Sequence, residues 1–177
     1  MEGDSADHKP IEKPETLTEA EQATVQKTWV KVYENKEAAG VAMLIRLFTT
    51  FPSAKLYFKD FRHMEDPKEM QTSVQLKKHS VRVMSALNTL VENIYNAEKT
   101  VSVLTTVAKS HAINHNVEPR YFKMLTEVIL EVLVEAFPET FVVEAQGAWA
   151  KLMDQVCWQV TQVYAGIGWS SENTAAE

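Results

Sequence analysis

The chain is poor in glycine and cysteine. Its 177 residues include five glycines and a single cysteine, Cys157. Proteins built from many short strands need many turn residues, so the scarcity of glycine favours long helices. One cysteine cannot form a disulfide within the chain, which is typical of a protein of the reducing cytosol. We therefore expect a cytoplasmic, largely helical protein.

Long apolar runs and clustered positive charge are also missing. No run approaches the length of a membrane-spanning helix, and residues 1–20 are polar and acidic, without the apolar core of a signal peptide. The formal net charge is −6, whereas nucleic-acid binding needs clustered Lys and Arg. These absences argue against an integral membrane segment and against a nucleic-acid partner.

A helical pattern of apolar residues is present in a chain of single-domain length. Apolar residues make up 45% of the sequence, enough for a large core. Thr18 and Glu21 form a capping box before the first amphipathic segment. A charged connector is expected at 61–69. The spacing of apolar residues predicts an all-α fold of about seven or eight helices, which include helices near 18–35, 41–51, 52–58, 72–95, 97–111, 119–138 and 143–164.

Two histidines, His79 and His111, each fall on the apolar side of a predicted helix, and the aromatic segment Tyr57–Phe61 precedes the first. Neutral imidazole is a good iron ligand, and an apolar pocket controls which small molecule shares the metal. Two imidazoles that project from separate helices into one apolar space, with a Phe at its edge, would hold a haem. The chain has five histidines, so the spacing alone leaves open that these two are unrelated.

The segments around both histidines carry a family resemblance. Phe51–Phe58 looks like the third-helix corner of the globins, Lys78–Val83 is similar to their distal helix, and Ser110–Phe122 resembles their proximal histidine turn. Within the globin superfamily the chain looks most like the vertebrate cytoglobins, on the stretches 63–67, 86–93, 117–119, 128–132 and 163–169.

The resemblance covers nearly the whole chain and implies a globin domain over 17–169. Residues 1–16 are polar and contain prolines, so we expect a disordered tail there, and a short flexible tail at 170–177. The cofactor implied is haem b, iron protoporphyrin IX. It would be bound without covalent attachment, because the chain lacks the C-x-x-C-H motif.

The resemblance assigns positions around the haem iron. His111 would be the proximal ligand, and Ser110 would accept its other ring N–H. His79 would be the distal histidine, which takes part in ligand chemistry, and Phe58 would stack on the macrocycle. The remaining expected neighbours of the haem are Leu44 and Val83 on the ligand side, Arg82 and His115 at the propionates, and Tyr121 and Phe122 on the floor.

Other interpretations stay open at several positions. Arg82 also fits a solvated helix residue. His111 and His115 have the spacing of a zinc pair, although no nearby Cys or extra carboxylate completes a tetrahedral set. His8 and His63 lie in polar segments and are expected at the surface.

The resemblance implies a globin that binds O2, NO and CO reversibly, with its iron held by both histidines. It also implies nitric oxide dioxygenation, or related peroxide or nitrite chemistry, which needs an electron donor that the sequence does not identify. A plain O2 store or carrier is the alternative, so the question of enzymatic activity stays open, as does that of a homodimer. A haem-free helical scaffold is a third interpretation.

The chain departs from the mammalian cytoglobins in its cysteines. Those proteins carry a cysteine pair that acts as a redox switch, and Lys36 and Val81 occupy the matching positions here. A disulfide between these two positions is therefore impossible. Cys157 lies among apolar residues of the last predicted helix, where we expect a buried, inert thiol.

Overall fold

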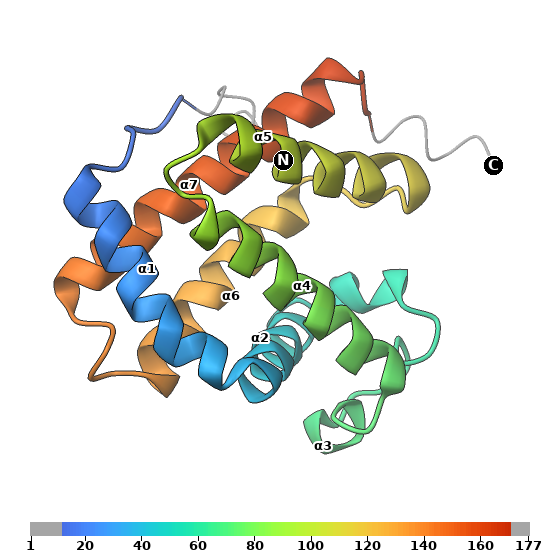
Figure 1. Cartoon of the computed structure of the whole chain (residues 1–177). Coiled ribbons are helices and arrows are strands. Elements are labelled where there is room, and N and C mark those ends of the chain that lie inside the picture. The colour runs from blue at the N-terminus through green and yellow to red at the C-terminus, as the bar shows by residue number, and fades with distance from the viewer. Residues whose placement is uncertain (1–11, 171–177) are drawn as a thin grey trace, which may run out of the picture.

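The computed structural model describes residues 12–170, and these form an all-α domain (Figure 1). The all-α expectation is confirmed. Most of the two expected tails, residues 1–11 and 171–177, lies outside the described residues. In the described part the elements are α1 Glu19–Glu34, α2 Lys36–Thr50, a 3₁₀-helix η1 Pro52–Tyr57, α3 Pro67–Met70, α4 Val74–Glu92, α5 Ala97–Lys109, a π-helix η2 Ser110–Asn114, α6 Arg120–Ala136 and α7 Val143–Gly166.

Side-chain caps define where several helices begin. The predicted capping box of α1 is formed: the Thr18 hydroxyl accepts from the Glu21 amide at 3.1 Å, and the Glu21 carboxylate accepts from the Thr18 amide at 3.0 Å. Asp66, Ser73 and Asn96 cap the starts of α3, α4 and α5 in the same way with one side-chain oxygen each. These bonds satisfy amides that have no partner within the helix.

The charged connector expected at 61–69 contains a short helix, α3, that the apolar pattern did not predict. Pro67 occupies its first turn, and the Asp66 carboxylate accepts from the Lys68 amide at 3.0 Å. Met70 at its end is fully buried. A helix of four residues is too short to show an apolar period, so only the Asp-Pro start could have indicated it.

The helix that carries His111 is longer than expected. The sequence placed its end at His111, but η2 continues the chain in a wider π-turn to Asn114. The break follows at Asn116, which has a positive φ of 51°, a left-handed conformation that Asn tolerates better than most residues. The two asparagines therefore mark the true end, a few residues after the histidine.

The core lies where α2 crosses α4 and α6, and where α5 and α1 pack against α7 (Figure 1). Its largest side chains include Trp149, whose ring lies 5.6 Å from that of Trp29 and 5.9 Å from that of Phe141. The Trp149 indole N–H donates to the buried Thr28 hydroxyl at 2.8 Å, so the one polar atom of this side chain is satisfied. This cluster attaches α1 to α7.

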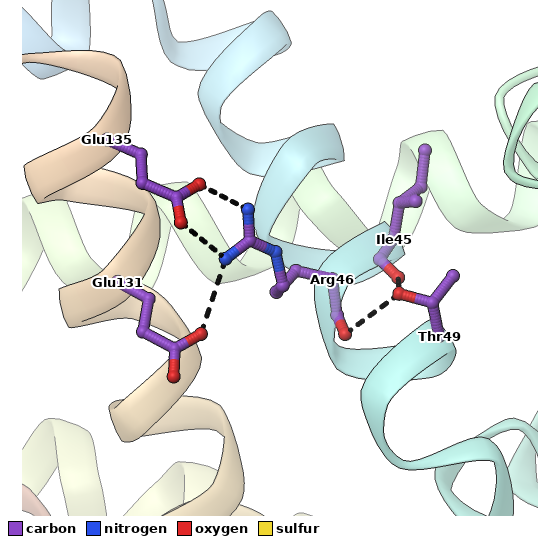
Figure 2. Close-up of polar contacts among 5 residues, drawn as sticks. All are labelled: Ile45, Arg46, Thr49, Glu131 and Glu135. Atoms are coloured by element: carbon purple, nitrogen blue, oxygen red, sulfur yellow. Dashed lines mark hydrogen bonds and ion pairs between the residues drawn. The ribbon is translucent and has the colours of Figure 1, made fainter.

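An exposed ion-pair cluster joins α2 to α6 on the surface (Figure 2). The Arg46 guanidinium donates through both terminal nitrogens to the Glu135 carboxylate, and it reaches Glu131 at 3.3 Å. On the same helix, the Thr49 hydroxyl lies 2.9 Å from the Ile45 carbonyl oxygen and 3.2 Å from that of Arg46, to which it can donate, and it makes no bond to the two glutamates. Exposed pairs of this kind stabilise by about 0–1 kcal/mol, so the cluster adds little to the core.

No helix between residues 12 and 170 is both long enough and apolar enough to span a membrane.

Gly40 lies at the contact between α2 and α4. A Cβ atom at this position would lie 2.8 Å from Met84 Cγ and 3.3 Å from both the Ser80 Cβ and the Ser80 carbonyl oxygen. The absence of a side chain therefore permits the two helices to approach at a point next to His79. Gly147 is also the fifth residue of its helix, α7, but a Cβ there would meet nothing within 4 Å.

We predict opposite effects for Gly40→Ala and Gly147→Ala. The first should lower the free energy of unfolding by about 1–2 kcal/mol, because overpacking exceeds the gain in helix propensity. The second should raise it by about 0.5–1 kcal/mol through propensity alone. Chemical denaturation of both variants measures these values. An equal rise in the free energy of unfolding for Gly40→Ala and Gly147→Ala would show that the helix contact at Gly40 accommodates a methyl group without strain.

Candidate functional site

The distal half of the site is His79 on α4 with an aromatic cluster beside it. The Phe58 ring lies 4.9 Å from the His79 ring, edge to face. Behind it, the Phe58 ring stacks on Phe61 at 4.8 Å and meets Phe48 of α2 at 5.2 Å. Phe48 and Phe61 are almost completely buried, so Phe58 is held from behind by the core. The arrangement fixes one flat apolar surface next to an imidazole.

The proximal half is His111 on η2. Its ring Nδ1 lies 2.8 Å from the carbonyl oxygen of Val107, one turn earlier. A carbonyl oxygen can only accept, so Nδ1 carries the proton and Nε2 has the free lone pair that a metal requires. The sequence had assigned this acceptor role to Ser110; that assignment is wrong. The helical geometry places the residue four positions before the histidine under its ring, not the adjacent one.

The structure brings the two imidazoles together. The ring centres of His79 and His111 lie 6.5 Å apart, with an angle of 67° between the planes. A metal between two imidazole nitrogens needs bonds of about 2 Å on each side, and each nitrogen lies about 1.2 Å from its ring centre, so the expected separation is about 6–6.5 Å. The two side chains therefore fit an iron ion held between them.

Burial keeps both histidines neutral. It lowers the pKa of His79 to about 4, with a further contribution from the nearby His111 ring. Burial also lowers the pKa of His111, and the bond from its Nδ1–H to Val107 opposes this in part. Neutral imidazole is the form that binds a metal, so both rings are in the right protonation state near pH 7.

On the proximal side, α6 and α7 supply aromatic walls. The Phe122 ring lies 5.1 Å from that of His111, and its other aromatic neighbour is Tyr164 at 6.1 Å; its role on the floor of the haem pocket stays a prediction. The Tyr164 hydroxyl donates to the Val117 carbonyl at 2.7 Å, which attaches the segment after His111 to α7. This buried bond holds the proximal turn against the last helix.

Tyr121 is buried, but its contacts are with η1 and not with His111, unlike those of Phe122. Its ring lies 5.4 Å from that of Tyr57, and its hydroxyl donates to the Ser53 hydroxyl at 2.8 Å. It therefore joins α6 to η1, and its role as part of the haem floor stays a prediction.

The other expected neighbours of the haem lie on the elements around the two histidines. Leu44 is buried on α2, and Val83 is half-buried on α4. Arg82 and His115 are exposed. The positive charge of Arg82 is among the causes that lower the pKa of His79, and the His115 ring lies 6.2 Å from that of His111. The propionate contacts of Arg82 and His115 remain predictions.

Sequence reasoning missed three residues that shape the site. Val107 could have been found, because it lies four positions before His111 on the same helix face. Phe48 and Tyr164 gave no local signal, because their contacts with the site join separate elements.

The alternative of a zinc site at His111 and His115 gains no support. Within residues 12–170 there is no group of three or more His, Cys, Asp or Glu side chains placed to hold a metal ion by themselves. His63 is exposed, as expected, and His8 lies outside the described residues.

The sequence is similar to known globins over most of its length. The globin family profile matches residues 41–160. Cytoglobin-1 of zebrafish (Danio rerio) is 51% identical over 172 residues, which cover 97% of this chain and 98% of that protein. Cytoglobin-1 of medaka (Oryzias latipes) is 49% identical over 159 residues, 90% of each chain. Globin-1 of Petromyzon marinus is 30% identical over 141 residues, 80% of this chain and 88% of that protein. The chain therefore belongs to the globin family and is a haem-binding protein.

Proposed function

We propose that the chain binds haem b with His111 and His79 on opposite sides of the iron, and that it acts on nitric oxide and O2. The observation that carries the proposal is the separation of 6.5 Å between the two imidazole ring centres, which suits ligation of one iron by both. The neutral state of both rings supports it as well. The similarity to fish cytoglobins is consistent with it.

His111 is the permanent ligand in this proposal. Its Nδ1–H is fixed on the Val107 carbonyl, and Phe122 contacts one side of its ring. Both contacts set the ring orientation, and the hydrogen bond raises the basicity of the coordinating Nε2.

His79 is a displaceable ligand that competes with outside molecules. A ligand that needs the site free binds with an apparent affinity reduced by the fraction of time the site is open. If His79 occupies the site about 99% of the time, apparent affinity falls about 100-fold. Once displaced, the His79 N–H is placed to donate a hydrogen bond to an incoming gas molecule.

Bound haem supplies an iron that binds O2, NO and CO and exchanges single electrons with them. Conversion of nitric oxide to nitrate takes up one electron overall (NO + O2 + e⁻ → NO3⁻), so an outside one-electron donor is required. The Phe58, Phe61 and Phe48 rings form an apolar wall beside His79, which offers water no hydrogen-bond partner on that side.

A simple O2 store or carrier is the second candidate. A distal histidine that only donates a hydrogen bond, and never binds the iron, would favour it. The absorption spectrum of the reduced protein without added ligand separates the two, because six-coordinate and five-coordinate ferrous haem absorb differently. A five-coordinate spectrum would contradict the first proposal and favour the second.

We predict that His111→Ala loses most of its haem affinity. Changes in the outer shell of a metal ligand already cost about 10–100-fold, so loss of the ligand itself should cost more. Haem transfer to an acceptor protein measures the loss. His63→Ala, at an exposed histidine, is the matched control. Retention of a normal proximal spectrum in His111→Ala would show that another residue binds the iron.

We predict that His79→Ala has an open iron site and binds carbon monoxide faster, by up to about 100-fold if His79 is bound 99% of the time. Flash photolysis of the carbon monoxide complex measures the rebinding rate, again with His63→Ala as control. The reduced spectrum should change from six-coordinate to five-coordinate. Unchanged rebinding would mean that His79 does not compete for the iron.

We predict that thiol reductants do not change the rates of ligand binding. Lysine and valine contain no sulfur, so Lys36 and Val81 cannot form a disulfide. In the structure the Lys36 ammonium lies 4.7 Å from the centre of the Tyr33 ring, and Val81 is 57% exposed on α4. Burial raises the pKa of the Cys157 thiol, whose sulfur lies 3.3 Å from the Thr126 hydroxyl, so it is a poor nucleophile. Stopped-flow rates before and after reductant, at concentrations where no dimer forms, test this. A several-fold change that Cys157→Ser removes would reveal a route from this thiol to the pocket.

A further inference from the structure

Lys55 is a buried charged residue with no anionic partner among residues 12–170. It lies on η1 and is only 7% exposed. Its ammonium donates to the carbonyl oxygen of Met64 at 2.7 Å. None of the ion pairs formed within residues 12–170 includes it. Burial of an ammonium without a carboxylate costs free energy, so this position is not explained by stability alone.

The bond from Lys55 closes a segment that has few other hydrogen bonds. Residues 58–66, here called the corner, lie between η1 and α3 without forming a regular helix. Their backbone is held by single-turn bonds, such as Arg62 N–H to Phe58 O and Met64 N–H to Phe61 O, both 2.9 Å, and by one bond of 3.0 Å from the Asp60 amide to the Gln75 side chain of α4. Lys55 reaches across the corner to its far end, so one side chain joins the two ends of the segment.

The corner carries the aromatic surface of the distal site. Phe58 is its first residue and contacts His79 at 4.9 Å, and Phe61 stacks on Phe58 at 4.8 Å. Any displacement of the corner therefore moves the ring that touches the distal histidine. Segments held by few hydrogen bonds open at low free energy, so one further bond has a large effect on their mobility. The bond from the Lys55 ammonium to the Met64 carbonyl, here called the clamp, is such a bond.

We propose that Lys55 is a positioning residue: its bond to the Met64 carbonyl holds the corner so that Phe58 fixes the orientation of His79. The clamp thereby slows the departure of His79 from the iron and so controls how readily outside ligands enter. This kinetic consequence rests on the proposed function, because it requires His79 to bind the iron. The clamp on the corner does not depend on that.

Lys55→Met separates a positioning role from a merely structural one. Methionine has a similar length and no charge, and replacement of a buried unpaired charge by an apolar side chain is often neutral or stabilising. The thermal midpoint should therefore stay the same or rise. Lys59→Met, at an exposed lysine of the corner itself, is the matched control for loss of charge. Lys55→Arg keeps a cationic donor and should rescue the clamp.

The experiment uses the full-length, haem-loaded protein and two measurements. Hydrogen exchange at the Arg62 and Met64 amides reports the corner, and carbon monoxide competition after rapid mixing reports the dissociation of His79. In Lys55→Met both rates should rise about ten- to a hundredfold, the effect expected for loss of one hydrogen bond to a charged group. Lys59→Met should match the wild type, and Lys55→Arg should lie close to it.

Several results would overturn the proposal. Unchanged exchange and unchanged His79 dissociation in Lys55→Met would do so, as would equal changes in Lys59→Met. Failure of Lys55→Met to fold would also overturn it, because stability would then account for the residue. If the wild-type iron is five-coordinate, the proposed function fails in its six-coordination, while hydrogen exchange still decides whether Lys55 holds the corner.

Discussion

The close crossing of α2 and α4 at Gly40 is the constraint on which the distal site depends. Without a side chain at Gly40, the backbone of α2 approaches Ser80, the residue next to His79. From this crossing α2 continues to Leu44 and Phe48, and Phe48 supports the ring of Phe58. A wider crossing would move the aromatic support away from the histidine. The packing of two helices thus determines how an imidazole and a phenyl ring meet.

The proximal half is built independently, from η2, α6 and α7. The Val107 carbonyl orients the His111 ring from below, Phe122 touches it from the side, and the Tyr164 hydroxyl holds the next segment through Val117. The two halves face each other through the pair of histidine rings. A site made from two separately supported halves can hold one ligand firmly and release the other, which is the behaviour that the proposed function needs.

The sequence was sufficient for the all-α fold, because periodic apolar positions and helix caps are local signals. The pairing of His79 and His111 was indicated by the family resemblance, because their spacing alone left open that the two are unrelated. The sequence did not reveal three particular features. The acceptor for the His111 ring was assigned to its neighbour Ser110, although the helix places Val107 there. The short α3 was missed because four charged and apolar residues show no period. Nothing in the sequence marks Lys55 for burial, which is seen only in the folded chain. Such contacts depend on segments brought together in space.

The wide turn of η2 has a consequence for chain length. A π-turn accommodates one residue more per turn than the α-helix before it, and each residue of an α-helix rotates the chain by about 100°. The backbone bond of 2.9 Å from the Val117 amide to the His111 carbonyl then closes the turn before α6 begins. A relative with one residue fewer between these two positions would present a different face of α6 to the histidine, and Phe122 would point elsewhere. Alignment gaps between this chain and other proteins therefore belong outside residues 110–117.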